Sequence, residues 1–448
     1  MSLSVQRLSN PGNYPFIDTE VVFPASRISA EDAVCAFDNC IARGAGLSIS
    51  DGALNDAHIV STRNLNRFVS FDAATGILVA EAGVILADIA AAFVPRGWSL
   101  STVPGTNQIT LGGAIASDVH GKNHHTSGSF DRHVLWLDVL TAAQGIVRCS
   151  PTQEAELFHA TCGGMGLTGL ILAGAVQLVR VCGAWIKETG FKTRCLSQTL
   201  DLCAELYSYP YLVAWIDPHA DGSSMGRGYV MCGEPVDAHA FEGAASRSRA
   251  SKQGSKSFRV PAFVPVATID SRVLTQSINM LYTLKGLRGS SGRLICAEAF
   301  HSPIQSLDLR LFGGSHVTYQ FTVPFLAHEA FRSIFRRIVD SGLGSLISVL
   351  KLFGPQPQHP ENISFPQRGY NLGIDFRVSR KMFTLFRELD SIVLDYGGRH
   401  YLSKDVCLEP KSVRRGYGDK VENFLAVKRK WDPDNRFRSL QSMRLQLY

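Results

Sequence analysis

The chain has 448 residues, of which 45% are hydrophobic and 19% charged, so it is long enough for two domains with sizeable cores. The formal net charge of +6 is small for this length, and no helix-turn-helix or aromatic-interleaved basic repeat accompanies it, which argues against a nucleic-acid partner. The longest apolar runs, such as Leu170–Val179, are too short for a membrane span, and the polar start through Asn13 lacks a signal-peptide pattern. We therefore expect a cytoplasmic protein.

The first part of the chain alternates short helices and strands. Its patterns predict a helix over about Ser29–Ala42, a strand over Ile77–Ala82, a helix over Leu86–Phe93 and a strand over Val134–Thr141. This alternation favours an α+β domain.

The most informative part of the chain is a glycine-rich segment. It opens with Pro104-Gly-Thr-Asn-Gln-Ile-Thr-Leu-Gly-Gly113, continues through His120-Gly-Lys-Asn-His-His125 and closes with Gly163-Gly-Met-Gly-Leu-Thr-Gly169. Glycine N–H groups can approach a pyrophosphate closely, although a plain set of turns is the other interpretation. A second glycine loop at Arg43–Asp51 favours the anion site. No Gly-x-Gly-x-x-Gly joins a strand to a helix with an acidic residue about twenty positions on, so a Rossmann site is not indicated.

Together these loops resemble the FAD domain of vanillyl-alcohol-oxidase-type flavoproteins. The resemblance narrows to the decaprenylphosphoryl-β-D-ribose 2-oxidase family, the flavin subunits of the epimerase that makes the arabinose donor of mycobacterial cell walls. The matches run nearly end to end, and His-Gly-Lys-Asn-His-His is the most specific of them. The matching segments are His120–Phe130, Ala155–Phe158, Lys351–Pro355, Gly369–Asn371, Gly397–Asp405 and Arg429–Pro433.

The resemblance implies a two-domain α+β flavoprotein. We expect an FAD-binding domain over residues 1–184, an antiparallel-sheet substrate domain over 185–400, and a return to the FAD domain over 401–448 that ends in Asp432-Pro-x-x-x-Phe437. The cofactor-binding residues that the resemblance implies are Gly44, Gly46, Leu47, Ser48, Pro104, Gly105, Thr106, Thr110, Gly112, Gly113, Ser117, His120, Gly166, Gly169, Ile171 and Tyr401.

The resemblance also assigns the chemistry. Lys404 matches a lysine beside flavin and substrate, where a cation can stabilise reduced flavin or a developing alkoxide, or pair with a phosphate; without the resemblance it would be a surface charge. His120 matches a histidine at the active-site end of the glycine loop, and these two residues are our catalytic candidates. The substrate-binding candidates are Lys122, Trp215, Thr318, Gln320, Lys351, Asn371, Gly373 and Lys404. Ordinary structural roles remain open for them: His120 in a turn, Gln320 and Trp215 in strands, and Lys351 at a sheet edge.

One position departs from the wider group of flavoproteins, in agreement with the closer family, and three depart from the closer family itself. Leu47 stands where sugar and lactone oxidases often carry a flavin-linking histidine, so we expect non-covalent FAD. Ile49 replaces a pocket tyrosine, and Thr318 stands where the family often has a second glutamine. Gly373 stands where mycobacterial members have a cysteine, so inhibitors that bond to that thiol would find none. These changes bear on the substrate more than on the fold.

No metal site is predicted. The ten cysteines are scattered, with no Cys-x-x-Cys pair, and we expect them to be reduced and structural. His120, His124, His125 and His133 cluster in sequence, but no carboxylate or cysteine stands near them at a ligand spacing.

A basic stretch interrupts the second half of the chain. Gly243–Thr268 contains five basic residues and no acidic one, and we interpret its first half as a mobile loop. Residues 243–259 form either a solvated insertion or a segment that approaches acidic lipid headgroups or guides a polyprenyl-phosphate substrate.

The leading functional hypothesis is an FAD-dependent oxidoreductase that oxidises C2 of polyprenyl-phosphate-linked ribose to a keto sugar. A separate NAD(P)H-dependent reductase would then complete epimerisation to the arabinose form, with peripheral contact at the inner membrane face. Ile49 and Thr318 leave open an oxidase of a soluble or nucleotide-linked sugar, an alditol or an aldonolactone. A flavin-binding protein with a decayed redox site is the third hypothesis, and retention of Lys404, His120, Asn371 and Gln320 argues against it.

Overall fold

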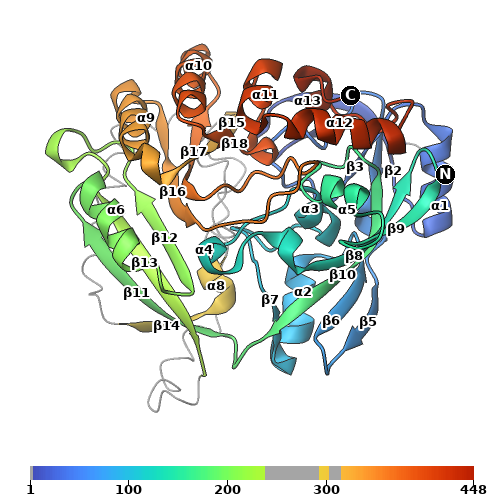
Figure 1. The fold of residues 1–448 in the computed structure, drawn as a ribbon, viewed down its shortest axis with the longest axis horizontal. Coiled ribbons are helices and arrows are strands. Elements are labelled where there is room, and N and C mark those ends of the chain that lie inside the picture. The colour runs from blue at the N-terminus through green and yellow to red at the C-terminus, as the bar shows by residue number, and fades with distance from the viewer. Residues whose placement is uncertain (1–3, 238–291, 302–313) are drawn as a thin grey trace, which may run out of the picture.

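The computed structural model describes residues 4–237, 292–301 and 314–448, and its elements form two halves (Figure 1). Two sheets and their helices make up one half, and a large antiparallel sheet backed by helices makes up the other. The basic stretch Gly243–Thr268 lies outside the described residues. No helix within the described ranges is both long and apolar enough to cross a membrane.

The first sheet has four strands in the order β1-β2-β4-β3. Its strands are β1 (Ser4–Ser9), β2 (Phe16–Val22), β3 (Cys40–Arg43) and β4 (His58–Ser61). β1 runs antiparallel to β2, whereas β4 runs parallel to both β2 and β3.

The predicted helix over Ser29–Ala42 is wrong at its C-terminal end. Helix α1 covers Arg27–Ala36, and the chain then enters β3. Asp38-Asn39 favours a turn because both side chains can hydrogen-bond to nearby backbone, and β-branched Ile41 suits the strand that follows. Cys40 and Ile41 are fully buried, so tertiary packing holds this segment as a strand.

The second sheet is antiparallel and is built around the long strand β10. It has the order β5-β6-β10-β8-β9, with β7 also paired to β10. Its strands are β5 (Phe68–Asp72), β6 (Ile77–Glu81), β7 (Trp98–Leu100), β8 (Val134–Thr141), β9 (Gly145–Cys149) and β10 (Leu170–Arg180). The predictions for β6, β8 and α2 (Leu86–Phe93) are confirmed.

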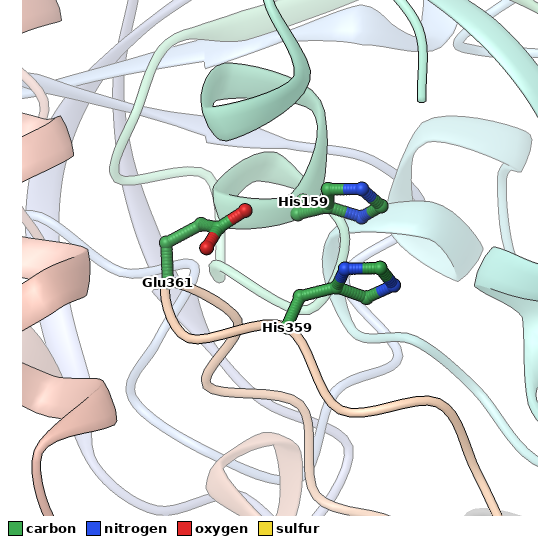
Figure 2. Close-up of side chains that lie close together, drawn as sticks. All are labelled: His159, His359 and Glu361. Carbon is green, nitrogen blue, oxygen red and sulfur yellow. The ribbon is translucent and has the colours of Figure 1, made fainter. Parts of the chain in front are cut away.

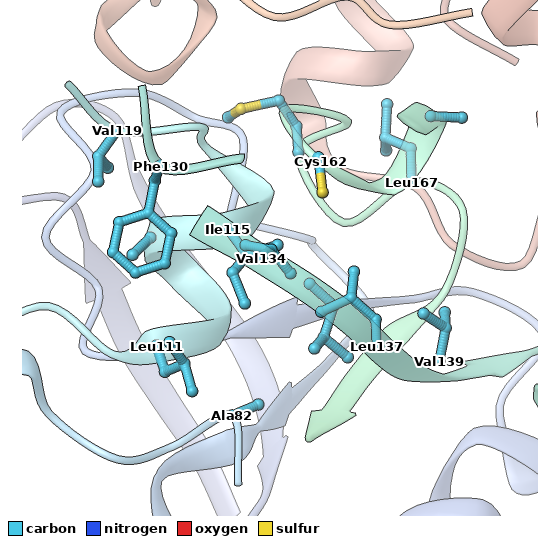
Figure 3. Close-up of a cluster of buried hydrophobic side chains, with 14 of the residues drawn as sticks. Ala82, Leu111, Ile115, Val119, Phe130, Val134, Leu137, Val139, Cys162 and Leu167 are labelled. Carbon is cyan, nitrogen blue, oxygen red and sulfur yellow. The ribbon is translucent and has the colours of Figure 1, made fainter. Parts of the chain in front are cut away.

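Helix α3 (Leu111–Ala116) packs into the core of this half, where Ile115 gathers with Val134 and Leu137 of β8 (Figure 3). Glycine makes this packing possible, because a Cβ on Gly112 would lie only 2.8 Å from the Cβ of Ala82. This half also contains the short helices α4 (His124–Ser127) and α5 (Ala155–Thr161) and the 3₁₀ turn Phe130–His133.

The third sheet has eight antiparallel strands in the described residues. Their order is β14 (Arg293–Cys296), β11 (Trp185–Thr193), β13 (Gly228–Val236), β12 (Tyr211–Ile216), β16 (Gly344–Phe353), β17 (Gly369–Arg377), β15 (His316–Val323) and β18 (Arg399–His400). Helices α6 (Leu196–Glu205), α9 (His328–Ser341) and α10 (Arg380–Asp395) pack against it, and α8 (Ala297–His301) lies near β11 and β14. The apolar stripe of α9, which includes Phe331, Ile334 and Ile338, is fully buried at helical spacing.

The chain then returns to the first half through α11 (Pro410–Tyr417), α12 (Lys420–Trp431) and α13 (Leu440–Leu445) (Figure 1). Their buried side chains belong to the core of that half. The buried Lys428 ammonium donates to Asp432 Oδ2 at 2.7 Å and to the carbonyls of Leu167 and Phe437 at 3.0 and 2.8 Å. Asp432 Oδ2 also accepts from the N–H of Phe437. Buried hydrogen bonds therefore hold the Asp432–Phe437 segment in place.

Candidate active site

One face of the eight-stranded sheet carries most of the predicted substrate residues. Successive side chains in a strand point to opposite faces, and directly paired residues share a face. The apolar residues of β15, β16 and β17, such as Phe321, Leu350 and Leu372, belong to the core with α9 and α10. The intervening residues form three rows on the other face: Thr318 with Asp375; Trp215, Val349, Gly373 and Gln320; and Lys351 with Asn371.

His120 reaches this face from the other half of the molecule. It follows α3, and its backbone forms an isolated antiparallel β-bridge with Ser129. The residue is only 7% exposed, with its Nε2 2.9 Å from Gln320 Nε2 and its Nδ1 3.3 Å from Lys351 Nζ. The structure thus brings together a glycine-loop histidine and two sheet residues about 200 positions away.

The hydrogen bonds define where the protons of this cluster lie. Gln320 Nε2 donates to Asn371 Oδ1 at 3.2 Å and also faces His120 Nε2, while Asn371 Nδ2 donates to the Phe321 carbonyl. Since the Gln320 amide nitrogen can only donate, a neutral His120 would accept at Nε2 and carry its proton on Nδ1, which suits the amine form of Lys351.

Burial and like charge keep this cluster from being fully protonated. Burial, followed by repulsion from Lys122 and Lys404, lowers the pKa of Lys351 to about 7. Burial and Lys351 lower the pKa of His120 well below 6.5. At neutral pH the imidazole is therefore neutral, and Lys351 is poised between amine and ammonium.

Lys404 lies in the 3₁₀ turn Leu402–Lys404, beside the same face. The turn is tied to β15, because the Tyr401 N–H donates to the Gln320 carbonyl at 3.0 Å. Burial lowers the pKa of Lys404 and Asp375 opposes that shift. Among the described residues the Lys404 ammonium makes no hydrogen bond or ion pair, so it is available to an anionic or hydroxyl ligand.

Asp375 is a site residue that the sequence reasoning missed. It accepts a 2.6 Å hydrogen bond from Thr318 Oγ1, and burial raises its pKa while Thr318 and Lys404 lower it. The signal was available, because Asn371, Gly373 and Asp375 alternate along one strand and must share a face.

An aromatic wall beside His120 was also missed as a feature of the site. Phe353 and Phe365 lie 4.8 and 6.1 Å from the His120 ring, centroid to centroid. The Tyr401 ring stacks on Phe365 at 4.7 Å, and its hydroxyl donates to the Ser117 carbonyl at 2.8 Å. Phe353 falls within the matching Lys351–Pro355 segment, but Phe365 lies in an irregular connection that carries no local signal.

The two glycine loops meet, as a cradle for a large ligand requires. A Cβ on Gly44 would overlap the Thr110 hydroxyl, which itself accepts from the Gly113 N–H at 3.2 Å to cap α3. A Cβ at Gly105 would meet nothing within 4 Å, so open space remains beside the Pro104–Thr106 turn. Gly46, Gly166 and Gly169 have φ values of +69°, +77° and +151°, which favour glycine.

The first glycine loop is also tied to the segment that carries Lys404. Ser48 Oγ donates to the Ser403 carbonyl at 2.9 Å. Arg444 of α13 pairs with both Asp51 and Asp405, at 2.8 and 3.0 Å. A cofactor held between the loops would therefore lie next to Lys404, and the residues present fit an extended FAD.

The remaining predicted residues are less directly placed. Ile171 is a buried residue of β10, and Leu47 and Thr106 lie in the loops just described. Lys122 donates to the Phe300 carbonyl, and its ammonium lies 4.3 Å from the centroid of the Phe300 ring, so it contacts α8 while its charge still acts on Lys351.

The clustered histidines each serve a separate backbone contact. His125 Nε2 lies 2.8 Å from the Tyr209 carbonyl and His133 Nε2 3.2 Å from that of Ser127, while His124 Nδ1 accepts from the Gly354 N–H at 3.2 Å. His124 and His125 thus tie the glycine loop to the second half, whereas His133 makes a contact within its own half.

Comparisons with known proteins agree with this arrangement. Residues 21–150 match the FAD binding domain family, and residues 374–445 match the D-arabinono-1,4-lactone oxidase family. Decaprenylphosphoryl-β-D-ribose oxidase from Mycolicibacterium smegmatis is 32% identical over 437 residues, which cover 96% of this chain and 93% of that protein. An uncharacterized Streptomyces coelicolor protein is 29% identical over 81% of this chain and its own full length. L-Gulonolactone oxidase from Bos taurus is 31% identical over 41% of each chain.

The predicted α+β fold of a two-domain vanillyl-alcohol-oxidase-type flavoprotein is confirmed, and so is FAD as the cofactor. The domain boundaries at 184 and 400 and the individual site residues stay predictions. The chain is an FAD-dependent oxidoreductase and belongs to the decaprenylphosphoryl-β-D-ribose oxidase family.

Proposed function

We propose that this protein oxidises the C2 hydroxyl of a polyprenyl-phosphate-linked ribose to the 2-keto sugar. The observation that carries the proposal is the similarity, over 96% of the chain, to an oxidase whose name specifies decaprenylphosphoryl-ribose. The sheet face with Lys404, Gln320 and Asn371 supports it, because buried polar groups of this kind suit a sugar bearing several hydroxyls.

The glycine loops would hold FAD, with Gly44, Gly46 and Ser48 on one side and Pro104–Gly113 on the other. When bound, FAD supplies the acceptor for the hydride that leaves the sugar carbon. The protein must bind the sugar, orient it and take the hydroxyl proton.

Lys404 and the His120–Lys351 pair divide this work in our proposal. Lys404 stabilises negative charge that develops on the sugar oxygen, since its ammonium has no partner among the described residues. Lys351 has a pKa of about 7, which suits a group that receives a proton at neutral pH, directly or through His120. Gln320 and Asn371 position His120 and hydrogen-bond the sugar hydroxyls.

The proposed reaction implies two partners, a reductase and a membrane surface. A 2-keto sugar must be reduced to complete epimerisation, so a separate NAD(P)H-dependent reductase follows. Because the proposed substrate carries a polyprenyl chain, we also propose a cytoplasmic enzyme in peripheral contact with the inner membrane face, where residues 243–259 would meet acidic headgroups.

A second candidate is oxidation of a soluble sugar, an alditol or an aldonolactone. The match of residues 374–445 to the D-arabinono-1,4-lactone oxidase family favours it, as do the departures Ile49 and Thr318.

Anaerobic titration of the flavin separates these hypotheses. We expect prenyl-phospho-ribose to bleach the visible flavin band of the wild-type protein, and Lys404→Met to slow bleaching by about 10²–10³-fold while still binding FAD. Asp419→Asn, at the start of α12, is the surface control. Bleaching by an aldonolactone or alditol alone would move the assignment to the second candidate. A bound flavin that no polyol or prenyl-phospho-sugar reduces would instead indicate a decayed redox site.

A further inference from the structure

Two histidines and a glutamate lie close together in the FAD half, apart from the flavin loops. His159 lies on α5, and His359 and Glu361 lie in the connection between β16 and β17 (Figure 2). Their candidate donor atoms all lie within 4.8 Å of one another, and each residue is half-buried. The two imidazoles stack with centroids 3.5 Å apart and planes 10° apart.

The three side chains have no hydrogen-bond partner of their own in the described residues, although His359 and Glu361 act electrostatically on Asp131 and Lys420. Within residues 4–237, 292–301 and 314–448 none of them donates or accepts a side-chain hydrogen bond, and Glu361 forms no ion pair within 4.0 Å. Imidazole lone pairs lie in the ring plane, so the two stacked rings direct theirs nearly parallel to each other. Rotation of the side chains out of the stack would bring these lone pairs and the Glu361 carboxylate onto one ion.

We propose that His159, His359 and Glu361 bind a divalent transition-metal ion, with Zn²⁺ as the best match. Two histidines and one carboxylate are a recurring zinc donor set, with a water molecule in the fourth position. Ligands bound at about 2.1 Å in tetrahedral geometry lie about 3.4 Å apart, so metal binding would turn the two imidazoles out of their stack and draw the donor atoms together. Neutral imidazole, the form that binds metal, predominates for an ordinary histidine above about pH 6.5.

Such an ion would fasten the β16–β17 connection to α5. Hydrogen bonds already hold this connection on both sides: Gln356 Nε2 donates to Asp131 at 2.9 Å, and Ser364 donates to Asp118. Phe365, next to Ser364, packs against Tyr401 in the candidate active site. The metal therefore has a structural role. It holds the connection that carries Phe365 of the aromatic wall, and it takes no part in the oxidation.

The test is zinc binding by the FAD-loaded enzyme after treatment with a chelator and desalting. Titration calorimetry with ZnCl₂ should show one saturable equivalent, and zinc should raise the melting temperature. His359→Ala and the nearly isosteric Glu361→Gln should each weaken binding by at least about tenfold and lose the thermal shift. His328→Ala, which alters an exposed histidine paired with Glu329 on α9, should bind zinc as the wild type does.

X-ray absorption at the zinc edge should then show two imidazole ligands in the wild type and one in His359→Ala. Unchanged binding in both site variants, or no saturable equivalent in the wild type, would overturn the proposal. The visible flavin spectrum of each variant verifies that it is folded. This test is independent of the sugar that the enzyme oxidises, because it requires no turnover.

Discussion

Lys351 illustrates how one buried cation can set a pH dependence. Its pKa falls from the ordinary 10.5 to about 7 because burial and the two neighbouring lysines disfavour the ammonium. Between those values the unfolded chain binds more protons than the folded one, so this group makes the protein more stable as the pH rises. The destabilisation is fully present below about pH 7 and disappears towards pH 10.5.

Lys351→Met should therefore raise the melting temperature of the FAD-loaded protein, with the largest gain near pH 6 and a clearly smaller one at pH 9. Thermal unfolding of both proteins across that range measures the effect. Lys381→Met, on the exposed start of α10, is the control and should give no trend with pH. A gain that is equal at both pH values would show that Lys351 keeps an ordinary pKa.

Gly373 should tolerate a cysteine. A Cβ at this position would lie 3.6 Å from the Gln320 side chain, which is an ordinary contact. We expect Gly373→Cys to fold, to bind FAD and to gain one adduct with an active-site-directed thiol reagent, as measured by intact mass. The wild type should gain none at position 373. An adduct found at position 373 in the wild type would contradict the conclusion that this position has no thiol.

The contact between the two glycine loops, at Gly44 and Thr110, can be tested directly. Gly44→Ala would push the new Cβ into the Thr110 hydroxyl and separate the loops. We expect weaker FAD binding, seen as flavin lost on desalting, and partial recovery in the double variant Gly44→Ala/Thr110→Ala. Gly183→Ala, where the nearest atom would be 3.7 Å from the Cβ, is the matched control. Undiminished retention of FAD in Gly44→Ala would argue against this loop as part of the cradle.

The buried pair in α12 should contribute strongly to stability. Lys428 and Asp432 have side chains that are 1% and 0% exposed, so Lys428→Met would leave a buried carboxylate without its cation. We expect a loss of about 3–5 kcal/mol in the free energy of unfolding, measured with urea. Lys430→Met, which breaks the exposed pair with Glu156, should cost at most about 1 kcal/mol. Similar losses in the two variants would disprove this contrast.

Local sequence patterns account for some elements of this fold, and long-range packing accounts for others. Local patterns identified β6, β8 and α2, and the motif matches predicted Lys351, Gln320 and Asn371, which lie together beside His120. The end of α1 was wrong because the burial of Cys40 and Ile41 depends on a strand almost twenty residues later. Phe365 was missed for the same reason, since its place beside His120 follows from tertiary packing and not from any periodic pattern.

For the whole molecule, the absence of a linking histidine at Leu47 predicts that acid precipitation releases all the flavin. The cofactor should also stabilise the fold, because it would lie between loops that Ser48 and Arg444 join to the Lys404 segment. We expect the melting temperature to rise with added FAD, as for any ligand that binds only the folded state. Flavin that stays with the acid precipitate would show a covalent bond and contradict the first expectation.

In the eight-stranded sheet, residues that face the candidate site alternate with residues that face the core, so the two sets can change independently during evolution. Substitutions at positions such as Thr318 and Gly373 alter the chemistry presented to a ligand, whereas the intervening residues hold the sheet to α9 and α10. A lineage built on this sheet can therefore acquire a new substrate through changes on alternate positions alone, without passing through poorly packed ancestors.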